Sequence, residues 1–335
     1  MSAYILAGDI GATKTVLSLA DDEGRVYHTG TFQNRAYSCF QDVLTAFLAD
    51  QENRPEYACF GVAGPVRQNQ CQMTNLSWGL NGSQLANQFD FKQAFLVNDL
   101  VATAAGVASL PVDRLISLNP GIRDPDGNIG VIAVGTGLGQ SFALPCHGRF
   151  HPLPTEGGHV SFAPRNKEQV ALLGFMQAQQ RHVSVEQVCS GMAFPTLYHF
   201  MCTRYPEPDW MLERRQQTAA VEQTRIIVEA ANAAVTQGPP CEPAVRAVQI
   251  MIDILADEAA NLALKVLATG GIYLGGGMIP RLLSFLNSKQ FMGIFSRGVY
   301  QEMLADIPIY LILEPDTALI GARQLAIDAA QLDNV

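Results

Sequence analysis

The sequence predicts an α/β protein with two domains, and three observations carry that prediction. Strand signals and helix signals alternate along the whole chain, which is typical of sheets covered by helices. The chain has 335 residues, and at about 150 residues a domain this length favours two domains. A strand, a glycine turn and a second strand occur at residues 4–19 and again at 130–144, so the two halves open in the same way.

In the first half, apolar runs at 4–7, 15–20 and 26–29 are separated by a glycine turn and by the acidic turn 21–24. This spacing predicts a meander of three strands rather than a βαβ unit. A helix is expected near 39–49, with Ser38 and Gln41 as a capping box. Continuous apolar runs at 57–63 and 94–97 predict strands buried in a mostly parallel sheet.

In the second half, strands are expected at 130–134 and 141–144. The clearest helix runs from Pro243 to about Ala268, where apolar residues follow steps of three and four until Gly270 and Gly271 end the pattern. Four further elements are predicted: a strand at 272–274, a helix at 281–286 with Pro280 near its first turn, a strand at 307–313, and a helix from about Ala318 capped by Asp316 or Thr317.

Composition excludes several classes of function. With 48% hydrophobic and 16% charged residues the chain can form a core and is not disordered. Lys and Arg number 22 against 31 Asp and Glu, and the resulting net charge of −9 opposes binding to nucleic acid or to an anionic membrane. No apolar run approaches the 18 or so residues of a membrane span, and the N-terminal segment lacks a basic region, so we expect a cytoplasmic protein. The seven cysteines are scattered without a CxxC pair, which indicates reduced thiols.

Three glycine-rich loops have the character of phosphate sites. Glycines let the backbone approach an anion closely, so the loop at 8–14 can hold phosphate oxygens with its N–H groups. It matches neither a Rossmann fingerprint nor a P-loop, and a tight hairpin turn with Asp9 capping its own backbone is the alternative. The loop at 135–139 has the same setting between two strands, and the cluster at 275–277 lies where a strand meets a helix. Two such loops in corresponding places favour a binding role.

Three polar groups are candidates for chemistry. Asn98 and Asp99 follow a buried strand directly, where ligands of α/β sheets lie, and a carboxylate there can accept a hydroxyl proton during phosphoryl transfer. Asp99 as the N-cap of a helix at 100–110 is the alternative, and both roles can hold together. The turn Glu156-Gly157-Gly158-His159 suits vicinal hydroxyls but also fits an exposed loop. Glu186 lies in a second capping-box pattern, 184–187, where a helix-dipole acid is the alternative.

Seven sequence blocks then occur in order along nearly the whole chain. They are GDIGAT at 8–13, MTNLSW at 73–78, LVND at 96–99, VGTGLG at 134–139, LPTEGGHVSFAP at 153–164, HVSVEQVCSG at 182–191 and LGGGMIPR at 274–281. With these blocks the chain resembles the bacterial ATP-dependent glucokinase family of the actin/hexokinase/Hsp70 superfamily.

The resemblance implies a two-lobed actin-like ATPase fold, related to ribonuclease H, with duplicated mixed sheets flanked by helices and an active-site cleft between the lobes. We expect residues 1–110 with 315–335 to form a small domain and 111–314 a large one, with a hinge near residue 110. The implied activity is ATP-dependent phosphorylation of D-glucose to glucose 6-phosphate, the first step of glycolysis, and a homodimer is implied.

The resemblance also implies roles for single residues. Asp99 would be the general base, and the sugar would be bound by Asn98, Asp99, Glu156, His159 and Glu186. The nucleotide would be bound by Gly8, Asp9, Ile10, Gly11, Ala12, Thr13, Gly135, Thr136, Gly137 and Gly139, with Gly275, Gly276 and Gly277 near the adenosine. Mg²⁺ would travel with ATP, largely through water, with Asp9 as its nearest carboxylate. Ala12 and Lys14 depart from the common family pattern, which leaves the phosphate donor open.

Two alternatives remain. A kinase for mannose, fructose or an N-acetyl amino sugar would use the same acid and loops. A sugar sensor that does not phosphorylate is disfavoured, because transcriptional relatives carry an N-terminal helix-turn-helix and here the first strand begins at residue 4. The related ROK (repressor/kinase) proteins carry a cysteine-rich zinc motif after the Glu-Gly-Gly-His turn. No cysteine occurs here between Cys146 and Cys189, so no structural zinc is expected.

Overall fold

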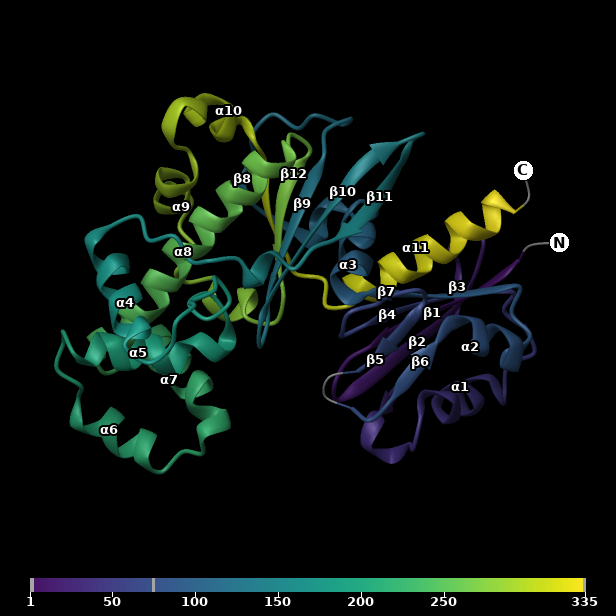
Figure 1. Ribbon diagram of the computed structural model, residues 1–335, viewed down its shortest axis with the longest axis horizontal. Coiled ribbons are helices and arrows are strands. Elements are labelled where there is room, and N and C mark those ends of the chain that lie inside the picture. The colour runs from purple at the N-terminus through teal and green to yellow at the C-terminus, as the bar shows by residue number, and fades with distance from the viewer. Residues whose placement is uncertain (1–2, 74–75, 334–335) are drawn as a thin grey trace. The chain divides into compact units, whose positions relative to one another are not determined.

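The chain folds into two compact units (Figure 1). A computed structural model describes residues 3–73 and 76–333. The first unit comprises the described parts of Met1–Val112, Ser141–Pro154 and Glu314–Val335, and the second comprises Asp113–Gln140 and Thr155–Leu313. The sequence-based division assigned 141–154 to the large domain. The structure groups this segment with the first unit, where Arg149 donates hydrogen bonds to Asp328 O (3.4 Å) and Gln331 Oε1 (2.6 Å) of the C-terminal helix.

The first unit is built on a five-stranded mixed sheet with the order β3-β2-β1-β4-β7. Its strands are β1 (Tyr4–Ile10), β2 (Lys14–Asp21), β3 (Val26–Gln33), β4 (Tyr57–Val62) and β7 (Gln93–Asn98). The first three pair antiparallel, which confirms the predicted meander. β4 and β7 run parallel to β1, as their continuous apolar character predicted.

Helices cover both faces of this sheet, because side chains of β1 alternate between two cores. Leu6 and Ile10 pack in the core with α1 (Phe40–Leu48) and α2 (Gly82–Phe89). Ile5 and Ala7 pack in the other core with α3 (Asp99–Val107) and α11 (Thr317–Leu332). A small hairpin of β5 (Gln70–Gln72) and β6 (Gly79–Asn81) completes the unit.

Helices α3 and α11 pack backbone against backbone through two glycines. A β-carbon placed on Gly321 would lie 1.7 Å from Ala102 O, and one placed on Gly106 would lie 2.1 Å from Thr317 O. Both distances are far below van der Waals contact, so only glycine fits at either position.

The second sheet has six strands in the order β11-β10-β9-β12-β13-β8. They are β8 (Leu115–Asn119), β9 (Ile129–Val134), β10 (Leu138–Cys146), β11 (Arg149–Pro154), β12 (Gly271–Gly275) and β13 (Ile309–Ile312). Strands β9, β12 and β13 are parallel, and β8 is antiparallel to β13. All four strands predicted in the second half are confirmed.

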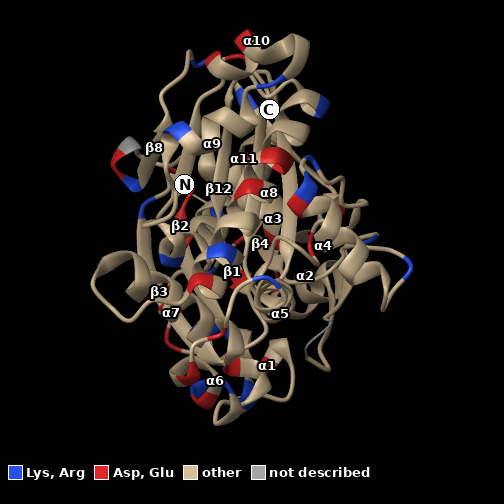
Figure 2. Cartoon of the chain, turned by 90° about the vertical axis from the view of Figure 1, so that its left-hand side faces the viewer, with Lys and Arg blue, Asp and Glu red and all other residues tan. Residues whose placement is uncertain are grey.

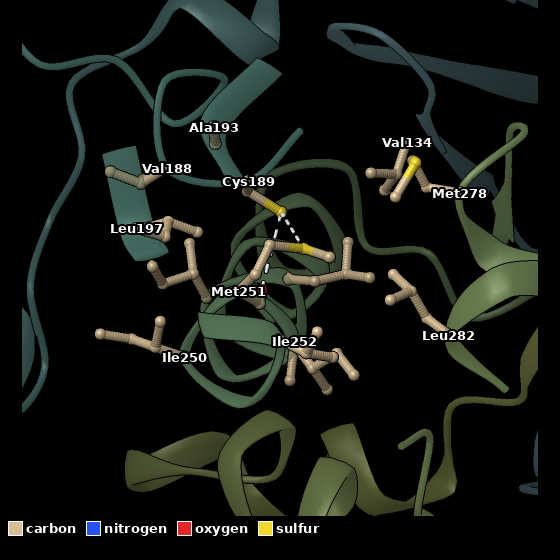
Figure 3. Packing of buried hydrophobic residues seen from close by; sticks show 14 of the residues in the cluster. Val134, Val188, Cys189, Ala193, Leu197, Ile250, Met251, Ile252, Met278 and Leu282 are labelled. Carbon is tan, nitrogen blue, oxygen red and sulfur yellow. Dashed lines mark hydrogen bonds between the residues drawn. The ribbon is translucent and has the colours of Figure 1, made fainter. Parts of the chain in front are cut away.

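The second unit is organised around α8 (Glu242–Val266), the long helix that the apolar spacing predicted. Met251, near its middle, is fully buried, and Figure 3 shows it directed toward Cys189 among Val188, Leu197 and Ile252. The Cys189 thiol lies 3.6 Å from the Met251 sulfur and donates to the Met251 carbonyl oxygen at 3.8 Å. Burial raises the pKa of this thiol, in keeping with the reduced cysteines expected from the sequence.

The remaining α-helices are α4 (Lys167–Gln177), α5 (Phe194–Cys202), α6 (Asp209–Gln216), α7 (Gln223–Thr236), α9 (Ser288–Phe295) and α10 (Gln301–Asp306). Short 3₁₀ helices occur at Asn34–Ala36, Val112–Arg114, Gly157–His159, Gly191–Ala193, Ala220–Glu222, Ile279–Leu282 and Gly298–Tyr300.

Figure 2 shows residues of both charge signs together on α6, where Arg214 pairs with Glu229 (2.5 Å) and Arg215 with Glu207 (2.8 Å). Within residues 3–73 and 76–333, no helix is both long enough and apolar enough to cross a bilayer.

The helix predicted at 281–286 is wrong. The chain forms a 3₁₀ helix at Ile279–Leu282 and then a turn. The Asn287 side chain then caps the next helix, α9, by accepting the Gln290 N–H (3.1 Å).

Both predicted capping boxes are also wrong. Helix α1 begins at Phe40 with Cys39 as its N-cap, so Ser38 lies one residue too early. The segment 184–187 forms a turn and no helix. Half of its capping box is nevertheless present, since Gln187 Oε1 accepts the Ser184 N–H at 2.9 Å.

Candidate active site

Asn98 and Asp99 lie where strand β7 ends and helix α3 begins. Asn98 is the N-cap, because its Oδ1 accepts the Leu100 N–H at 2.9 Å, and its Nδ2 donates to Gly64 O at 3.2 Å. Asp99 is therefore the first helical residue, and the alternative that made it the N-cap is wrong. Its carboxylate also accepts the Leu100 N–H (2.9 Å). A preceding side chain fixes the helix start and leaves the Asp99 side chain available for another role.

The carboxyl group of Asp99 has an unusual proton affinity. Burial raises its pKa from 3.8 to about 6, the Leu100 N–H opposes that rise, and the negative charge of Asp9 adds to it. Burial likewise raises the pKa of Asp9. The positive charge of the nearby Lys14 lowers this pKa, and the negative charge of Asp316 raises it. A half-buried carboxylate with a pKa near 6 can accept a proton at neutral pH, which is the property of a general base.

The first glycine loop is an exposed turn held from behind by Asn34. Asn34 is 2% exposed, and its Nδ2 donates to Gly11 O at 2.9 Å. Its Oδ1 accepts the Thr15 hydroxyl at 2.8 Å, and its backbone N–H donates to Thr13 O at 2.9 Å. These three hydrogen bonds fix the turn between β1 and β2. Sequence reasoning missed Asn34, since its partners lie about 20 positions earlier in the chain.

Two glycines near this turn are explained by packing. A β-carbon on Gly8 would lie 2.7 Å from Phe60 Cδ1, so the first glycine of the loop is needed by the core. Gly61 of β4 was not predicted. A β-carbon there would lie 3.1 Å from Ala102 Cβ, so this small residue lets β4 pack closely against α3, the helix that begins at Asp99.

The second glycine loop, in the second unit, is held by the segment around Glu186. Gly191 N donates to Gly135 O at 2.9 Å, and Met192 N donates to Thr136 O at 3.0 Å. Glu186 Oε2 accepts the Leu138 N–H at 2.8 Å, and a β-carbon on Gly137 would lie 2.3 Å from the same oxygen. Glu186 therefore belongs to the support of this loop rather than to a helix start.

Glu156, His159 and Glu186, the three residues of this unit that the family resemblance implies for sugar binding, lie close to one another. His159 Nε2 is 3.9 Å from Glu156 Oε2, and His159 Nδ1 is 3.9 Å from Glu186 Oε1. The His159 and Glu156 side chains are 63% and 76% exposed, whereas Glu186 is 21% exposed. An imidazole between two carboxylates presents donors and acceptors in one place, which suits adjacent sugar hydroxyls.

The third glycine cluster lies beside the second loop. Gly275 ends β12 opposite Ala133 of β9, and Met278 N donates to Val134 O at 3.0 Å. Gly276 has a φ of +90°, and a β-carbon there would lie 2.4 Å from Val134 O. The loops at 135–139 and 275–277 thus meet at the carboxyl ends of two parallel strands, where α/β sheets bind ligands.

The predicted site residues fall into two sets, one in each unit. The first unit holds Gly8 to Thr13, Asn98 and Asp99, and the second holds residues 135–139, Glu156, His159, Glu186 and 275–277. Thr74 and Asn75 of the MTNLSW block lie outside the described residues. Within the described part of the chain, no group of three or more His, Cys, Asp and Glu residues could hold a metal ion.

Comparison with known proteins gives a consistent result. The family model Glucokinase matches residues 6–329. The chain is 35% identical to a glucokinase from Nostoc sp., over 96% of this chain and 98% of that protein. Its structure is similar to that of a glucokinase from an Antarctic psychrotroph, with a TM-score of 0.83, 28% identity and coverage of 97% and 99%.

A more distant solved structure shares the fold. It is a ROK family glucokinase from Streptomyces griseus in complex with glucose and AMPPNP, with a TM-score of 0.64, 20% identity and coverage of 97% and 100%. These similarities confirm the predicted actin-like ATPase fold.

Proposed function

The chain belongs to the glucokinase family and phosphorylates glucose with ATP, and on that premise we propose which of its residues carry the reaction. Asp99 is the general base for the 6-hydroxyl of glucose. The observation that supports this assignment is a half-buried carboxyl group at the end of β7 whose pKa is raised to about 6.

In the proposed step, the glucose 6-hydroxyl loses its proton to Asp99 while its oxygen attacks the γ-phosphorus of ATP. The bond from the γ-phosphorus to the bridging oxygen breaks, and ADP leaves with the electron pair. Such a reaction needs little covalent work from the protein, so positioning and charge stabilisation supply the rate. The Asp99 carboxylate is oriented by the Leu100 N–H, which donates to its Oδ1 at 2.9 Å.

The nucleotide is assigned to the glycine loops. Its phosphates contact Gly8, Asp9, Ile10, Gly11, Ala12, Thr13, Gly135, Thr136, Gly137 and Gly139, and its adenosine lies near Gly275, Gly276 and Gly277.

Mg²⁺, when bound with ATP, neutralises phosphate charge. The carboxylate of Asp9 is suited to a place beside this ion, because Mg²⁺ prefers oxygen ligands. Burial raises the pKa of Asp9 even though the positive charge of Lys14 lowers it, so Lys14 alone does not offset the cost of burying the charged carboxylate. A further positive charge there would stabilise its ionised form.

The same premise supports a cytoplasmic homodimer acting at the first step of glycolysis. The net charge of −9 supports the proposal that neither nucleic acid nor a membrane is a partner.

The sugar is assigned to Asn98, Asp99, Glu156, His159 and Glu186. Glu156→Ala and His159→Ala are each expected to raise the KM for glucose about tenfold, because each removes a hydrogen-bonding group from a hydroxyl, and to leave the KM for ATP little changed. Glu186→Ala is expected to raise both constants, because its carboxylate also binds the Leu138 N–H of the second glycine loop. Steady-state kinetics with each substrate varied in turn provides the measurement. An unchanged glucose KM in all three variants would contradict the assignment.

The pH profile tests the base. A proton on Asp99 blocks the reaction, so kcat/KM for glucose at saturating MgATP is expected to fall about tenfold per pH unit below about pH 6 and to level off above it. Protonation of ATP also changes in this range. The residual activity of Asp99→Asn serves as the control, because it retains any effect of ATP and loses that of Asp99. A wild-type profile that stays flat down to pH 5 would exclude Asp99 as the base.

A further inference from the structure

The turn Glu156–His159 is supported from beneath by one residue of β10, Gln140. Gln140 is 4% exposed, and a β-carbon on Gly157 would lie 2.3 Å from its side-chain oxygen. The main chain of Gln140 also reaches the turn. Its carbonyl oxygen accepts the Thr155 hydroxyl at 3.1 Å, and the oxygen of that hydroxyl accepts the Gly157 N–H at 3.0 Å. Gly157 therefore lies against Gln140 and cannot move toward it.

The Gln140 side chain is held in turn by Glu258, which lies 118 positions later on α8. Glu258 is 3% exposed, and its Oε1 accepts the Gln140 Nε2 hydrogen at 2.8 Å. Its Oε2 accepts the Asn261 side-chain N–H at 2.9 Å. Both carboxylate oxygens of Glu258 therefore accept a hydrogen bond, and these two bonds fix the orientation of the oxygen that faces Gln140.

Charge is balanced within the surrounding cluster. Arg297 Nη2 donates to Asn261 Oδ1 at 2.6 Å, and Arg297 Nη1 binds the Asp257 carboxylate. Arg165 Nε lies 3.4 Å from Asp257 Oδ1. The two arginines thus hold Asp257 and Asn261, the residues that flank Glu258 on α8.

The side chains that the turn presents have little support of their own. Those of Glu156 and His159 are 76% and 63% exposed. Their positions therefore follow the backbone of the turn, which Gln140 contacts at Gly157 and which Glu186 contacts through its N–H to Gly158 O (2.9 Å). A shift of Gly157 would displace both side chains together.

We propose that Gln140 and Glu258 form a buried strut that positions the Glu156–His159 turn and thereby sets the affinity for glucose. Both are positioning residues and touch no substrate. The proposal rests on the proposed sugar-binding role of Glu156 and His159, and it extends that site to helix α8.

The first test is Gln140→Met, which keeps the length of the side chain and removes its amide. The KM for glucose is expected to rise about 5- to 20-fold, because the turn loses a buried contact, while kcat and the KM for ATP change less than about threefold. A purely structural role would lower thermal stability and leave the glucose KM unchanged. An unchanged glucose KM in a folded Gln140→Met protein would overturn the proposal.

The second test reverses the hydrogen bond. Gln140→Glu alone places two carboxylates against each other and is expected to raise the glucose KM at least as much as Gln140→Met. The double variant Gln140→Glu/Glu258→Gln provides a donor on α8 and an acceptor on β10, and the glucose KM is expected to return to within about threefold of wild type. A double variant no better than Gln140→Glu would contradict the strut.

Two controls separate the possible failures. Asp253→Ala removes a carboxylate from the same helix, where it accepts the Gln290 side chain of α9 (2.9 Å), and is expected to leave the glucose KM unchanged. Glu156→Ala is measured in parallel. If it leaves the glucose KM unchanged, the proposed sugar site fails; if it raises KM while a folded Gln140→Met does not, only the strut fails.

A milder variant covers the case in which Gln140→Met does not fold. Gly157→Ala changes a half-buried residue of the turn and brings its new methyl group against the Gln140 amide. It is expected to raise the glucose KM about 5- to 20-fold, and an unchanged glucose KM would overturn the proposal.

Discussion

Asp99→Asn is expected to lower kcat by about 10²–10⁴ while glucose binds with nearly unchanged affinity. The amide has almost the shape of the carboxylate and can still accept the Leu100 N–H that holds the side chain. It cannot take up the proton of the 6-hydroxyl, so the loss falls on the chemical step. A coupled assay for ADP gives kcat, and calorimetric titration with glucose gives the affinity. A kcat within tenfold of wild type would exclude Asp99 as the general base.

The stability of the same variant provides its control. The pKa of Asp99 is about 6 in the folded chain and close to 3.8 when unfolded, so the folded state binds this proton more tightly. Stability from this group is present below about pH 3.8 and is lost as the pH rises through about 6. At pH 7.5 the charged carboxylate therefore destabilises the fold, and Asp99→Asn is expected to raise the Tm. A lower Tm would contradict this stability effect, and activity is compared only at temperatures where both proteins are folded.

Gly321→Ala is expected to destabilise the first unit by about 3 kcal/mol, the largest stability effect that we predict for a single methyl group. The added carbon would lie 1.7 Å from Ala102 O and 2.6 Å from Gly106 N, and both are backbone atoms of α3 that no rotamer change can move. The two helices must separate, and α3 carries Asp99 at its first position. We therefore expect activity to fall as well. Urea unfolding followed by circular dichroism measures the change in the transition of the first unit.

Gly293→Ala is the matched control. Gly293 also lies inside a helix, α9, but a β-carbon there meets nothing within 4 Å. Removing a helical glycine in open space is expected to be neutral or to stabilise by up to about 1 kcal/mol. Equal destabilisation by both variants would show that helix propensity, and not the contact between α3 and α11, governs position 321.

The parts of the fold that were predicted correctly depend on local patterns. The meander of β1 to β3 follows from short apolar runs broken by turn residues, and α8 follows from its steps of three and four. Parallel β4 was recognisable because a strand buried on both faces lacks polar alternation. The apolar run of β7 was predicted to be buried in the same way, but β7 is the edge strand of the sheet and is only partly buried.

Local patterns failed where a distant partner decided the outcome. Residues 184–187 have the composition of a capping box, and Gln187 makes its hydrogen bond to Ser184. No helix follows, because the chain instead places the Glu186 carboxylate on Leu138 N–H, 48 positions earlier, and Gly191 on the backbone of Gly135. The alternative role of Asp99 as the cap of α3 failed because the equally suitable Asn98 precedes it and takes that position.

In the candidate site too, some residues could be found from the sequence, whereas others depend on partners that are distant in the chain. Glu156 and His159 were named from their chemistry and Glu186 from the family resemblance, and the structure brings the three together. Asn34 and Gln140 carry no motif, since each acts through partners that only the fold supplies: Gly11 and Thr13 for one, Gly157 and Glu258 for the other. No reading of neighbouring residues could have identified either.

The distribution of thiols makes the hairpin of β10 and β11 accessible to labelling. All seven cysteines lie in the described part of the chain, and Cys146, next to the tip of that hairpin, is the exposed one. Cys59 and Cys189 are fully enclosed, and burial raises the pKa of the half-buried Cys202 to about 11, which slows its reaction with maleimides. A fluorophore can therefore be attached to Cys146 in a Cys39→Ser background, and its emission would follow the hairpin during turnover without any cysteine being added to the chain.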